Sequence, residues 1–239
     1  MNRTSGSESQ RHPMDLGEVQ TGLLRRLPVL GRMVMADPAL LDIAVVLRRL
    51  RPGETVYHAG QEAHHLFLVV SGSFKLLRTS TNGRTVTVNL ALQGEAFGGL
   101  GLAAGQTYRE SAVALTASQV MSLPRTELRE LAVRHPVLTH YLIELLVARL
   151  EDAEAKILRL SSAPARSRVA TALLLVLDRG GGRNGRITLT RRDLASLTGM
   201  ATETTSRVLS ALQGEGAIVR RREFITVVDR NRLAEAAEF

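Results

Sequence analysis

Cysteine is missing from the 239 residues of this sequence. Its absence excludes disulfide bonds, cysteine-ligated zinc and cysteine-ligated iron–sulfur clusters. The sequence also lacks any run of roughly 18 apolar residues that could cross a membrane. Its amino-terminal part has no continuous apolar core of the kind that a signal peptide needs. We therefore predict a cytoplasmic protein without a membrane partner.

Lysine is nearly absent as well, because Lys75 and Lys156 are the only lysines among 31 basic residues. The formal net charge is +8, and it is concentrated towards the end of the chain: from residue 165 onwards, 13 arginines stand against eight acidic residues. Arginine favours contacts with phosphates and base edges. This segment is therefore predicted to face nucleic acid, although charge alone is equally compatible with DNA, RNA or an anionic membrane.

Short apolar runs, rich in β-branched residues and separated by glycines, extend from Leu50 to about Leu123. Regularly spaced strands with glycine corners predict an antiparallel barrel or sandwich. We place this domain at residues 21–134, after a polar tail at residues 1–20 that is expected to be mobile.

A long helix with a heptad seam is predicted in the next segment, residues 135–163. Apolar residues recur there at alternating steps of three and four, which is typical of a two-stranded coil. Charged residues border the seam, so we predict a parallel homodimer, with packing against the chain's own barrel as the alternative. Residues 161–164 interrupt the pattern and are expected to form a hinge. The seam consists of Ile143, Leu146, Leu150, Ala153, Ile157 and Leu160.

The last segment, residues 164–239, contains a predicted helix-turn-helix. Thr190 and Asp193 have the spacing of a capping box, which marks the start of a first helix. Gly199 supplies a turn in which positive φ is favourable. In the second helix Thr205, Val208, Leu209 and Leu212 form one apolar stripe.

The opposite face of this second helix is short, polar and able to form hydrogen bonds. Arg207 suits the O6 and N7 atoms of guanine, Glu203 can accept from N4 of cytosine, and Ser206 is adaptable. We therefore predict base reading from this face, with an ordinary amphipathic helical hairpin as the alternative. The predicted base-reading residues are Thr202, Glu203, Ser206 and Arg207.

A β-hairpin wing is predicted after the helix-turn-helix, where apolar runs flank three consecutive arginines. Basic residues at such a place lie close to DNA phosphates. The predicted phosphate contacts are Thr190, Arg191, Arg192, Arg220, Arg221 and Arg222.

In this order of segments the chain resembles the Crp/Fnr family of bacterial transcription regulators. The resemblance implies an α+β fold: an amino-terminal cyclic-nucleotide-binding-type jelly roll, a long dimerisation helix and a winged helix-turn-helix. Glu203, Ser206 and Arg207 match the E-x-x-S-R arrangement of the Fnr branch. Thr202 stands where the cyclic-AMP-receptor branch has an arginine, which implies half-sites closer to TTGA than to TGTGA. The stretches that carry the resemblance are RPGETVYHAG, LFLVVSGSFKLL, LQGEAFGGLGL and LTRRDLASLTGMATETTSRVLSALQGEGAI.

The same resemblance places an effector pocket in residues 97–115. A cyclic nucleotide needs a carboxylate for its ribose and an arginine with a small hydroxyl for its phosphate. Gly99 stands where the glutamate is expected. Anchoring on Ala114 puts Tyr108 where the arginine is expected, with Arg109 beside it, although a shift of one residue would restore Arg109 as the anion ligand. The effector could be cyclic AMP or another small anion such as 2-oxoglutarate, or there could be none. Tyr108 could equally be an aromatic residue at the rim of the barrel, and Arg109 a surface charge. The candidate pocket residues are Phe97, Gly98, Gly99, Leu100, Tyr108, Arg109, Ser111 and Arg149.

Two other kinds of function compete with a DNA-binding regulator. His58, His64 and His65 near Glu62 suggest a cupin-like metal enzyme, but the adjacent histidines of a strand would point to opposite faces. A helix-turn-helix can also bind a protein instead of DNA. We expect a non-enzymatic regulator without a metal, and its expected partners are double-stranded DNA, a second copy of the chain and RNA polymerase.

Overall fold

The computed structural model describes residues 46–98, 105–179, 182–183, 185–221 and 224–238. The chain divides into two units, Met1–Ile43 and Ala44–Phe239, and all the described residues belong to the second unit. The tail predicted at residues 1–20 lies outside the described residues.

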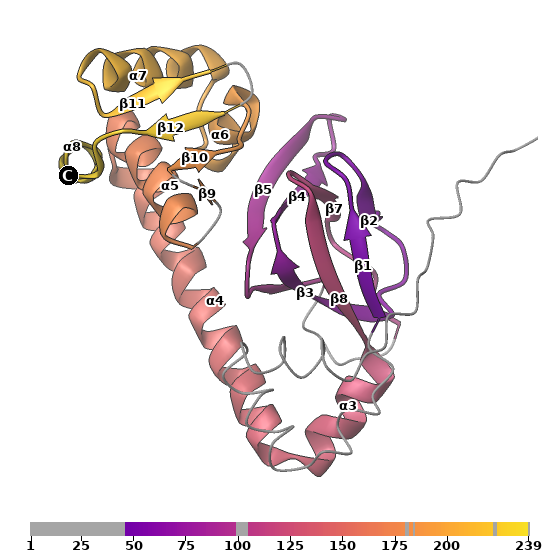
Figure 1. Cartoon of the computed structure of the whole chain (residues 1–239). Coiled ribbons are helices and arrows are strands. Elements are labelled where there is room, and N and C mark those ends of the chain that lie inside the picture. Colours follow the sequence, from indigo (N-terminus) through magenta and orange to yellow (C-terminus); the bar gives the residue numbers. More distant parts are fainter. Residues whose placement is uncertain (1–45, 99–104, 180–181, 184, 222–223, 239) are drawn as a thin grey trace, which may run out of the picture. The chain divides into compact units, whose positions relative to one another are not determined.

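Residues 46–124, which we call the sandwich domain, form two antiparallel four-stranded sheets (Figure 1). The sheets have the strand orders β1-β8-β3-β6 and β2-β7-β4-β5 and remain separate, so a sandwich forms and not a closed barrel. The first strand begins earlier than the predicted Leu50. The strands are β1 Val46–Leu50, β2 Thr55–Tyr57, β3 His65–Ser71, β4 Ser73–Thr79, β5 Thr85–Leu92, β6 Ala96–Phe97, β7 Ser111–Ala114 and β8 Ser118–Pro124.

The interior of the sandwich domain follows from alternation along its strands. In β7, Ala112 and Ala114 are buried and their neighbours are half-buried, as expected for a strand with one face in a core. Five of the chain's eight phenylalanine and tyrosine residues meet in this core. Burial of each large side chain stabilises the fold by about 1.5–3 kcal/mol. The aromatic core consists of Tyr57, Phe67, Phe74, Phe97 and Tyr108.

The tight connection between β3 and β4 depends on glycine. Gly72 has a φ of +82°, and a Cβ atom there would lie 2.2 Å from Oγ of Ser118 and 2.8 Å from the carbonyl oxygen of Ala117. Both the backbone angle and the close approach of β8 exclude a side chain at this position.

Two helices follow the sandwich domain: α3, Arg125–Arg134, and α4, Pro136–Ser162. The sequence analysis missed α3, although Leu128 and Leu131 are buried at the spacing of a helix. The long helix was predicted, with a hinge at residues 161–164. Ser161 and Ser162 still belong to α4, and both hydroxyl groups donate to the carbonyl oxygen of Leu158, so the connection shrinks to residues 163–164.

Within the described residues, no single helix is long and apolar enough to cross a membrane. Only α3 and α4 taken together, bent by 115° at their junction, have the required length and composition.

Residues 165–238, the carboxy-terminal domain, contain four helices and a small sheet among the described residues. The sheet has the order β11-β12-β10-β9. The core is aliphatic and is built from residues such as Leu173, Leu194, Leu209 and Leu233, all fully buried. The elements are α5 Ala165–Asp178, β9 Gly182–Arg183, β10 Arg186–Ile187, α6 Arg191–Leu197, α7 Thr202–Gly214, β11 Ile218–Arg220, β12 Ile225–Val227 and α8 Arg230–Ala237.

Candidate nucleic-acid interface

The capping box predicted at the start of α6 is confirmed. Oγ1 of Thr190 accepts from the backbone N–H of Asp193 at 3.0 Å, and the Asp193 carboxylate accepts from the backbone N–H of Thr190 at 3.3 Å. Such a cap stabilises a helix by about 0.5–2 kcal/mol. It fixes Arg191 and Arg192 in the first turn of α6, where both are exposed.

Gly199 forms the turn between α6 and α7 with a φ of +63°. A Cβ atom there would lie 2.8 Å from Cδ2 of Leu160, so the end of α4 packs directly on this turn. Arg168 strengthens the junction, because its Nη1 donates to the carbonyl oxygens of Thr198 at 3.2 Å and Leu160 at 3.5 Å. The sequence analysis did not single out Arg168, since its target atoms are backbone carbonyls that leave no sequence pattern.

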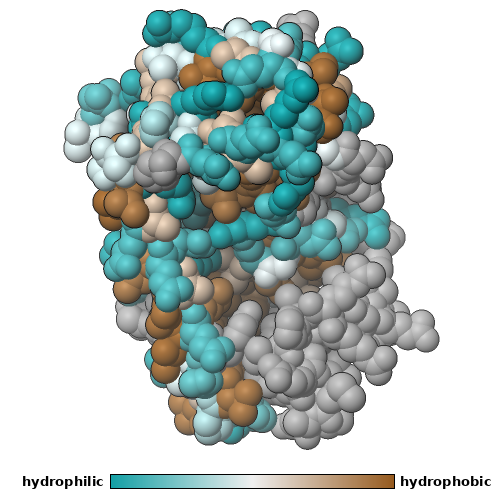
Figure 2. Space-filling view, turned by 90° about the vertical axis from the view of Figure 1, so that its left-hand side faces the viewer, coloured by the Kyte–Doolittle hydropathy of each residue, from teal (hydrophilic) through white to brown (hydrophobic). Residues whose placement is uncertain are grey.

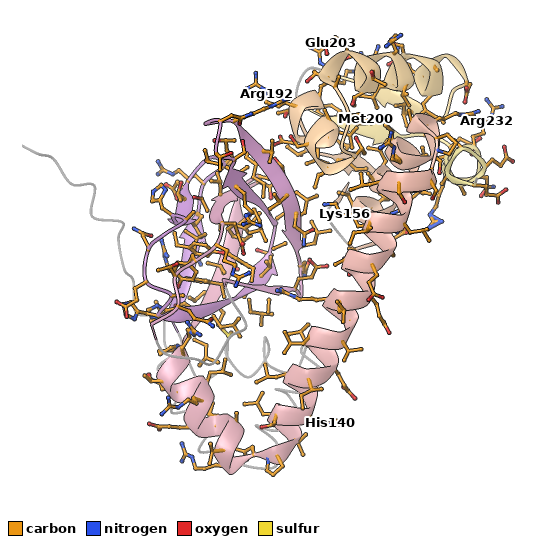
Figure 3. The ribbon with its side chains drawn as sticks, turned by 180° about the vertical axis from the view of Figure 1, so that it is seen from behind. His140, Lys156, Arg192, Met200, Glu203 and Arg232 are labelled. Carbon is orange, nitrogen blue, oxygen red and sulfur yellow. The ribbon has the colours of Figure 1, made fainter. Side chains whose placement is uncertain are left out.

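The second helix, α7, presents a polar face outward. Thr205, Leu209 and Leu212 are buried, whereas Glu203 and Arg207 are exposed. Figure 3 shows Glu203 at the outer side of α7. The remaining predicted base-reading residues, Thr202 and Ser206, are half-buried. The geometry therefore brings the four side chains onto one accessible helix face, with long charged groups at its most exposed points.

The predicted phosphate-contacting residues differ in their surroundings. Arg191, Arg192 and Arg221 are exposed, and Arg222 lies outside the described residues. Thr190 uses its hydroxyl in the cap. Arg220 packs the wing against α7: its Nε donates to Oε1 of Gln213 at 3.3 Å, and its Nη1 donates to the carbonyl oxygen of Ser206 at 3.4 Å. We conclude that Arg220 already has partners within the domain.

Arg186 of β10, which the sequence analysis missed, stacks on Phe224 of the wing. The guanidinium carbon of Arg186 lies 3.7 Å from the ring centroid of Phe224. A cation–π contact of this kind holds the side chain against the hairpin and keeps positive charge near its tip.

The predicted seam residues lie on an exposed face of α4. Ile143, Leu150 and Ile157 are 53%, 60% and 67% exposed in the single chain, and Ala153 is exposed too. Figure 2 looks onto this side of the molecule, where hydrophobic patches lie between hydrophilic ones. Leu160 differs, since it also contacts Gly199. The seam therefore leaves apolar surface that the described part of its own chain does not cover, as a pairing helix would.

The candidate effector residues have mixed surroundings. Tyr108 belongs to the aromatic core: its ring stacks on Tyr57 with a centroid distance of 3.8 Å, and its hydroxyl donates to the carbonyl oxygen of His65 and accepts from the His65 N–H. Ser111 accepts from the backbone N–H of Ala59, and Arg109 is exposed. Phe97 is the last residue of β6 and Gly98 follows it, whereas Gly99 and Leu100 lie outside the described residues.

Arg149 reaches the sandwich domain from α4 and donates to the carbonyl oxygen of Ala96. Burial lowers the pKa of this guanidinium, while Glu95 and Glu110 act in the opposite direction. Tyr57, which the sequence analysis missed, has a buried hydroxyl without a hydrogen-bond partner in the described part of the chain, and burial raises its pKa. A lone tyrosine in a strand of mixed composition gives no sequence signal for such a position.

Tyr108 stands at the predicted arginine position when the alignment is anchored on Ala114, and a shift of one residue would put the exposed Arg109 there instead. The hydroxyl of Tyr108 is satisfied by backbone groups of His65, and its ring stacks on that of Tyr57.

The alternative metal site lacks ligands: His64 and Glu62 form an exposed pair at 3.4 Å, and no group of three potential metal ligands occurs in the described residues.

Comparison with known proteins agrees with this architecture. A cyclic nucleotide-binding domain model matches residues 47–135, and a Crp-like helix-turn-helix domain model matches residues 167–236. The cyclic AMP receptor protein of Thermus thermophilus is 38% identical over 184 residues, which cover 76% of this chain and 84% of that protein. The chain belongs to the Crp/Fnr family of transcription regulators.

Further members of the Crp/Fnr family extend the comparison. The fumarate and nitrate reduction regulatory protein of Escherichia coli is 28% identical over 201 residues, covering 80% of each chain. The structure of FixK2 from Bradyrhizobium japonicum matches with a TM-score of 0.70 and 26% identity, covering 82% of this chain and 99% of that one. As a Crp/Fnr regulator, the chain is a DNA-binding protein with an effector-type domain and is not an enzyme.

Proposed function

We propose that this regulator binds an inverted-repeat DNA sequence as a homodimer and reads TTGA-like half-sites with α7. The observation that carries this proposal is the outward pair of Glu203 and Arg207 on a helix whose opposite face is buried. Glutamate and arginine are suited to cytosine and guanine edges in the major groove. The absence of a third charged residue at Thr202 favours TTGA over TGTGA.

The dimer follows from the exposed seam on α4. Pairing two copies along Ile143 to Leu160 would cover apolar side chains that a single chain leaves in water. A twofold axis along this seam would present two recognition helices to successive major grooves, about 34 Å apart. Inverted-repeat DNA has the same symmetry as such a dimer.

Affinity would come from phosphate contacts around this reading face. Arg191, Arg192, Arg221 and Arg222 are the candidates, and Thr190 would contribute through the helix start that it caps. Each phosphate that the protein neutralises makes the affinity for DNA fall more steeply as the salt concentration rises. We infer that the bound dimer acts on RNA polymerase at promoters, and therefore in the cytoplasm.

We infer further that the effector, if one is used, is a small anion held between the sandwich domain and α4. Arg149 is a cation that reaches from α4 to the carbonyl oxygen of Ala96, and the buried hydroxyl of Tyr57 has no hydrogen-bond partner in the described part of the chain. An anion there would pair with the guanidinium and accept a hydrogen bond from the hydroxyl. Cyclic AMP is disfavoured because Tyr108, in the alignment anchored on Ala114, stands at the position of the phosphate-binding arginine.

Selection from random double-stranded DNA tests the main proposal. We expect enrichment of an inverted repeat with TTGA-like half-sites, together with a dimer mass by light scattering. A monomer, or enrichment without twofold symmetry, would contradict the proposal. If a protein instead of DNA bound specifically to the face that carries Glu203 and Arg207, the protein-binding alternative would be favoured.

Thermal unfolding with added compounds tests the effector. Cyclic AMP, cyclic GMP and 2-oxoglutarate are compared at equal concentration, and we expect the dicarboxylate to raise the midpoint more than either nucleotide. The increase should disappear in Arg149→Met. Arg134→Met, which removes an exposed arginine that pairs with Glu130 within α3, serves as the matched control. Equal stabilisation of Arg149→Met and the wild type would overturn the assignment.

A further inference from the structure

The carboxylate of Asp193 does more than cap α6. Its Oδ2 serves the cap, while its Oδ1 accepts from Oγ1 of Thr87 at 2.8 Å and lies 3.3 Å from Nζ of Lys75. Thr87 belongs to β5 and Lys75 to β4, so both partners come from the sandwich domain. One buried carboxylate therefore joins the start of the helix-turn-helix to two strands more than a hundred residues earlier in the chain.

This contact is well sheltered from water. The side chain of Asp193 is only 6% exposed and that of Lys75 25% exposed, and Thr87 is buried. Burial alone would raise the pKa of Asp193, but the hydrogen bonds from Thr190 and Thr87 and the charge of Lys75 hold the pKa below its usual value. A buried carboxylate that loses these partners would be strongly unfavourable, so the contact fixes the position of α6.

Other polar contacts between the same parts of the chain are weaker. Arg179 pairs with Glu95 of the sandwich domain at 3.3 Å, and also with Asp152 of α4 at 2.9 Å, but these groups are 30% to 58% exposed. Exposed ion pairs contribute about 0–1 kcal/mol and are screened by salt. The Asp193 contact is therefore the polar interaction that best defines where the helix-turn-helix lies.

The contact leaves the DNA-facing residues accessible. Arg191 and Arg192 precede Asp193 and are exposed, and Figure 3 places Arg192 where α6 meets the sandwich domain while Glu203 lies at the outer side of α7. A contact that blocked DNA would have to cover these groups.

We propose that Lys75 and Thr87 are positioning residues for DNA recognition: through Asp193 they hold the helix-turn-helix in an orientation that is competent to bind DNA. This inference rests on the proposed function. The carboxy-terminal domain also contacts Leu160 of α4 through Gly199 and Arg168, and the Asp193 contact adds a buried polar link to the sandwich domain. Without that link the domain would sample more orientations, and DNA would have to select among them. Holding one orientation removes that cost from binding.

The test compares Lys75→Met and Thr87→Val with the full-length wild type on the DNA sequence recovered by selection. Each variant should bind that sequence about 5- to 150-fold more weakly, which is the usual range of coupling between sites. Lys75→Arg and Thr87→Ser should recover most of the affinity, because they restore a donor to Asp193. Matched controls are Arg78→Met and Thr85→Val, which alter exposed residues of the same two strands and should bind like the wild type.

The salt dependence separates positioning from direct phosphate contact. A lysine that touches DNA contributes about one phosphate to the slope of log affinity against log salt, so its removal would flatten the slope by about 0.9. A positioning role predicts an unchanged slope for Lys75→Met, together with faster hydrogen exchange of the α6 amides. Unchanged affinity, or a flatter slope without faster exchange, would overturn the inference. Failure of the wild type to bind any specific DNA would instead overturn the proposed function.

Discussion

The sandwich domain and the carboxy-terminal domain differ in where their chemistry lies. The carboxy-terminal domain has an aliphatic core, and its polar groups of interest, such as Glu203 and Arg207, point outward from one helix. The sandwich domain instead gathers tyrosines and phenylalanines inside, and polar atoms such as the Tyr57 hydroxyl and the Arg149 guanidinium lie against that core. An outward-facing site can be recognised in the sequence from the periodicity of one helix. An inward-facing site can be recognised only in the tertiary structure, because it depends on which strands lie next to each other.

The largest expected effect comes from disturbing the two cores separately. Phe74→Ala and Leu209→Ala each remove a side chain that is 0% exposed, one from each domain. We expect losses in the free energy of unfolding of about 3–5 kcal/mol for Phe74→Ala and 2–5 kcal/mol for Leu209→Ala. Tyrosine fluorescence during urea unfolding, measured in a Tyr141→Phe background, follows the sandwich domain through Tyr57 and Tyr108, and far-UV circular dichroism follows the whole chain. If the cores are independent, only Phe74→Ala should shift the fluorescence transition strongly; equal shifts would show one cooperative unit.

Asp193→Asn should produce the next largest effect, because it removes a charged acceptor that both domains share. Charge-assisted hydrogen bonds contribute about 1.5–3 kcal/mol, so we expect a loss of that order near neutral pH. The folded-state pKa of Asp193 is depressed, and its contribution is therefore present above the unfolded pKa of about 3.9 and is lost as pH falls through the folded value. The difference in stability between the wild type and Asp193→Asn should shrink below about pH 4. A difference that stays constant to lower pH would contradict this linkage.

Arg207→Ala tests the outward-facing site without touching either core. Loss of a bidentate contact with guanine should cost about 1–3 kcal/mol of specific affinity and relax the preference at one base pair of each half-site. Competition with mutated half-sites measures both quantities. Arg191→Ala is the contrasting variant, since a phosphate contact should weaken binding to all sequences alike and flatten the salt dependence. If Arg207→Ala behaves in the same way as Arg191→Ala, then Arg207 contacts phosphates and does not read bases.

Much of the carboxy-terminal domain was predictable because its signals are local. The Thr190–Asp193 cap depends on a spacing of three residues, and the turn at Gly199 on one glycine. The buried stripe of α7 repeats every three or four residues. The wing hairpin was predicted to within a few residues, but the partners of Arg220 were not, because Gln213 and the Ser206 carbonyl oxygen approach it only after folding.

The sandwich domain resisted prediction for the opposite reason. Its strands and their glycine corners could be predicted, whereas the choice between barrel and sandwich depends on which strand edges pair. The stacking of Tyr57 on Tyr108 joins residues from β2 and from the segment before β7. The bond from Thr87 to Asp193 spans 106 residues. No periodicity in the sequence encodes such contacts, and they are where the remaining functional questions lie.

Tyr108→Phe has the smallest expected effect and bears most directly on the contrast between the domains. If Tyr108 is a core residue, the variant loses only its hydrogen bonds with His65, at a cost of about 0.5–1.5 kcal/mol in the free energy of unfolding, and keeps its ring stacked on Tyr57. Any stabilisation by a small anion should then be the same as in the wild type, because Arg149 is unchanged. Thermal unfolding of both proteins with and without 2-oxoglutarate provides the measurement. Loss of the ligand response at nearly unchanged stability would instead make the Tyr108 hydroxyl part of the pocket, and the sandwich interior would then be a binding site as well as a core.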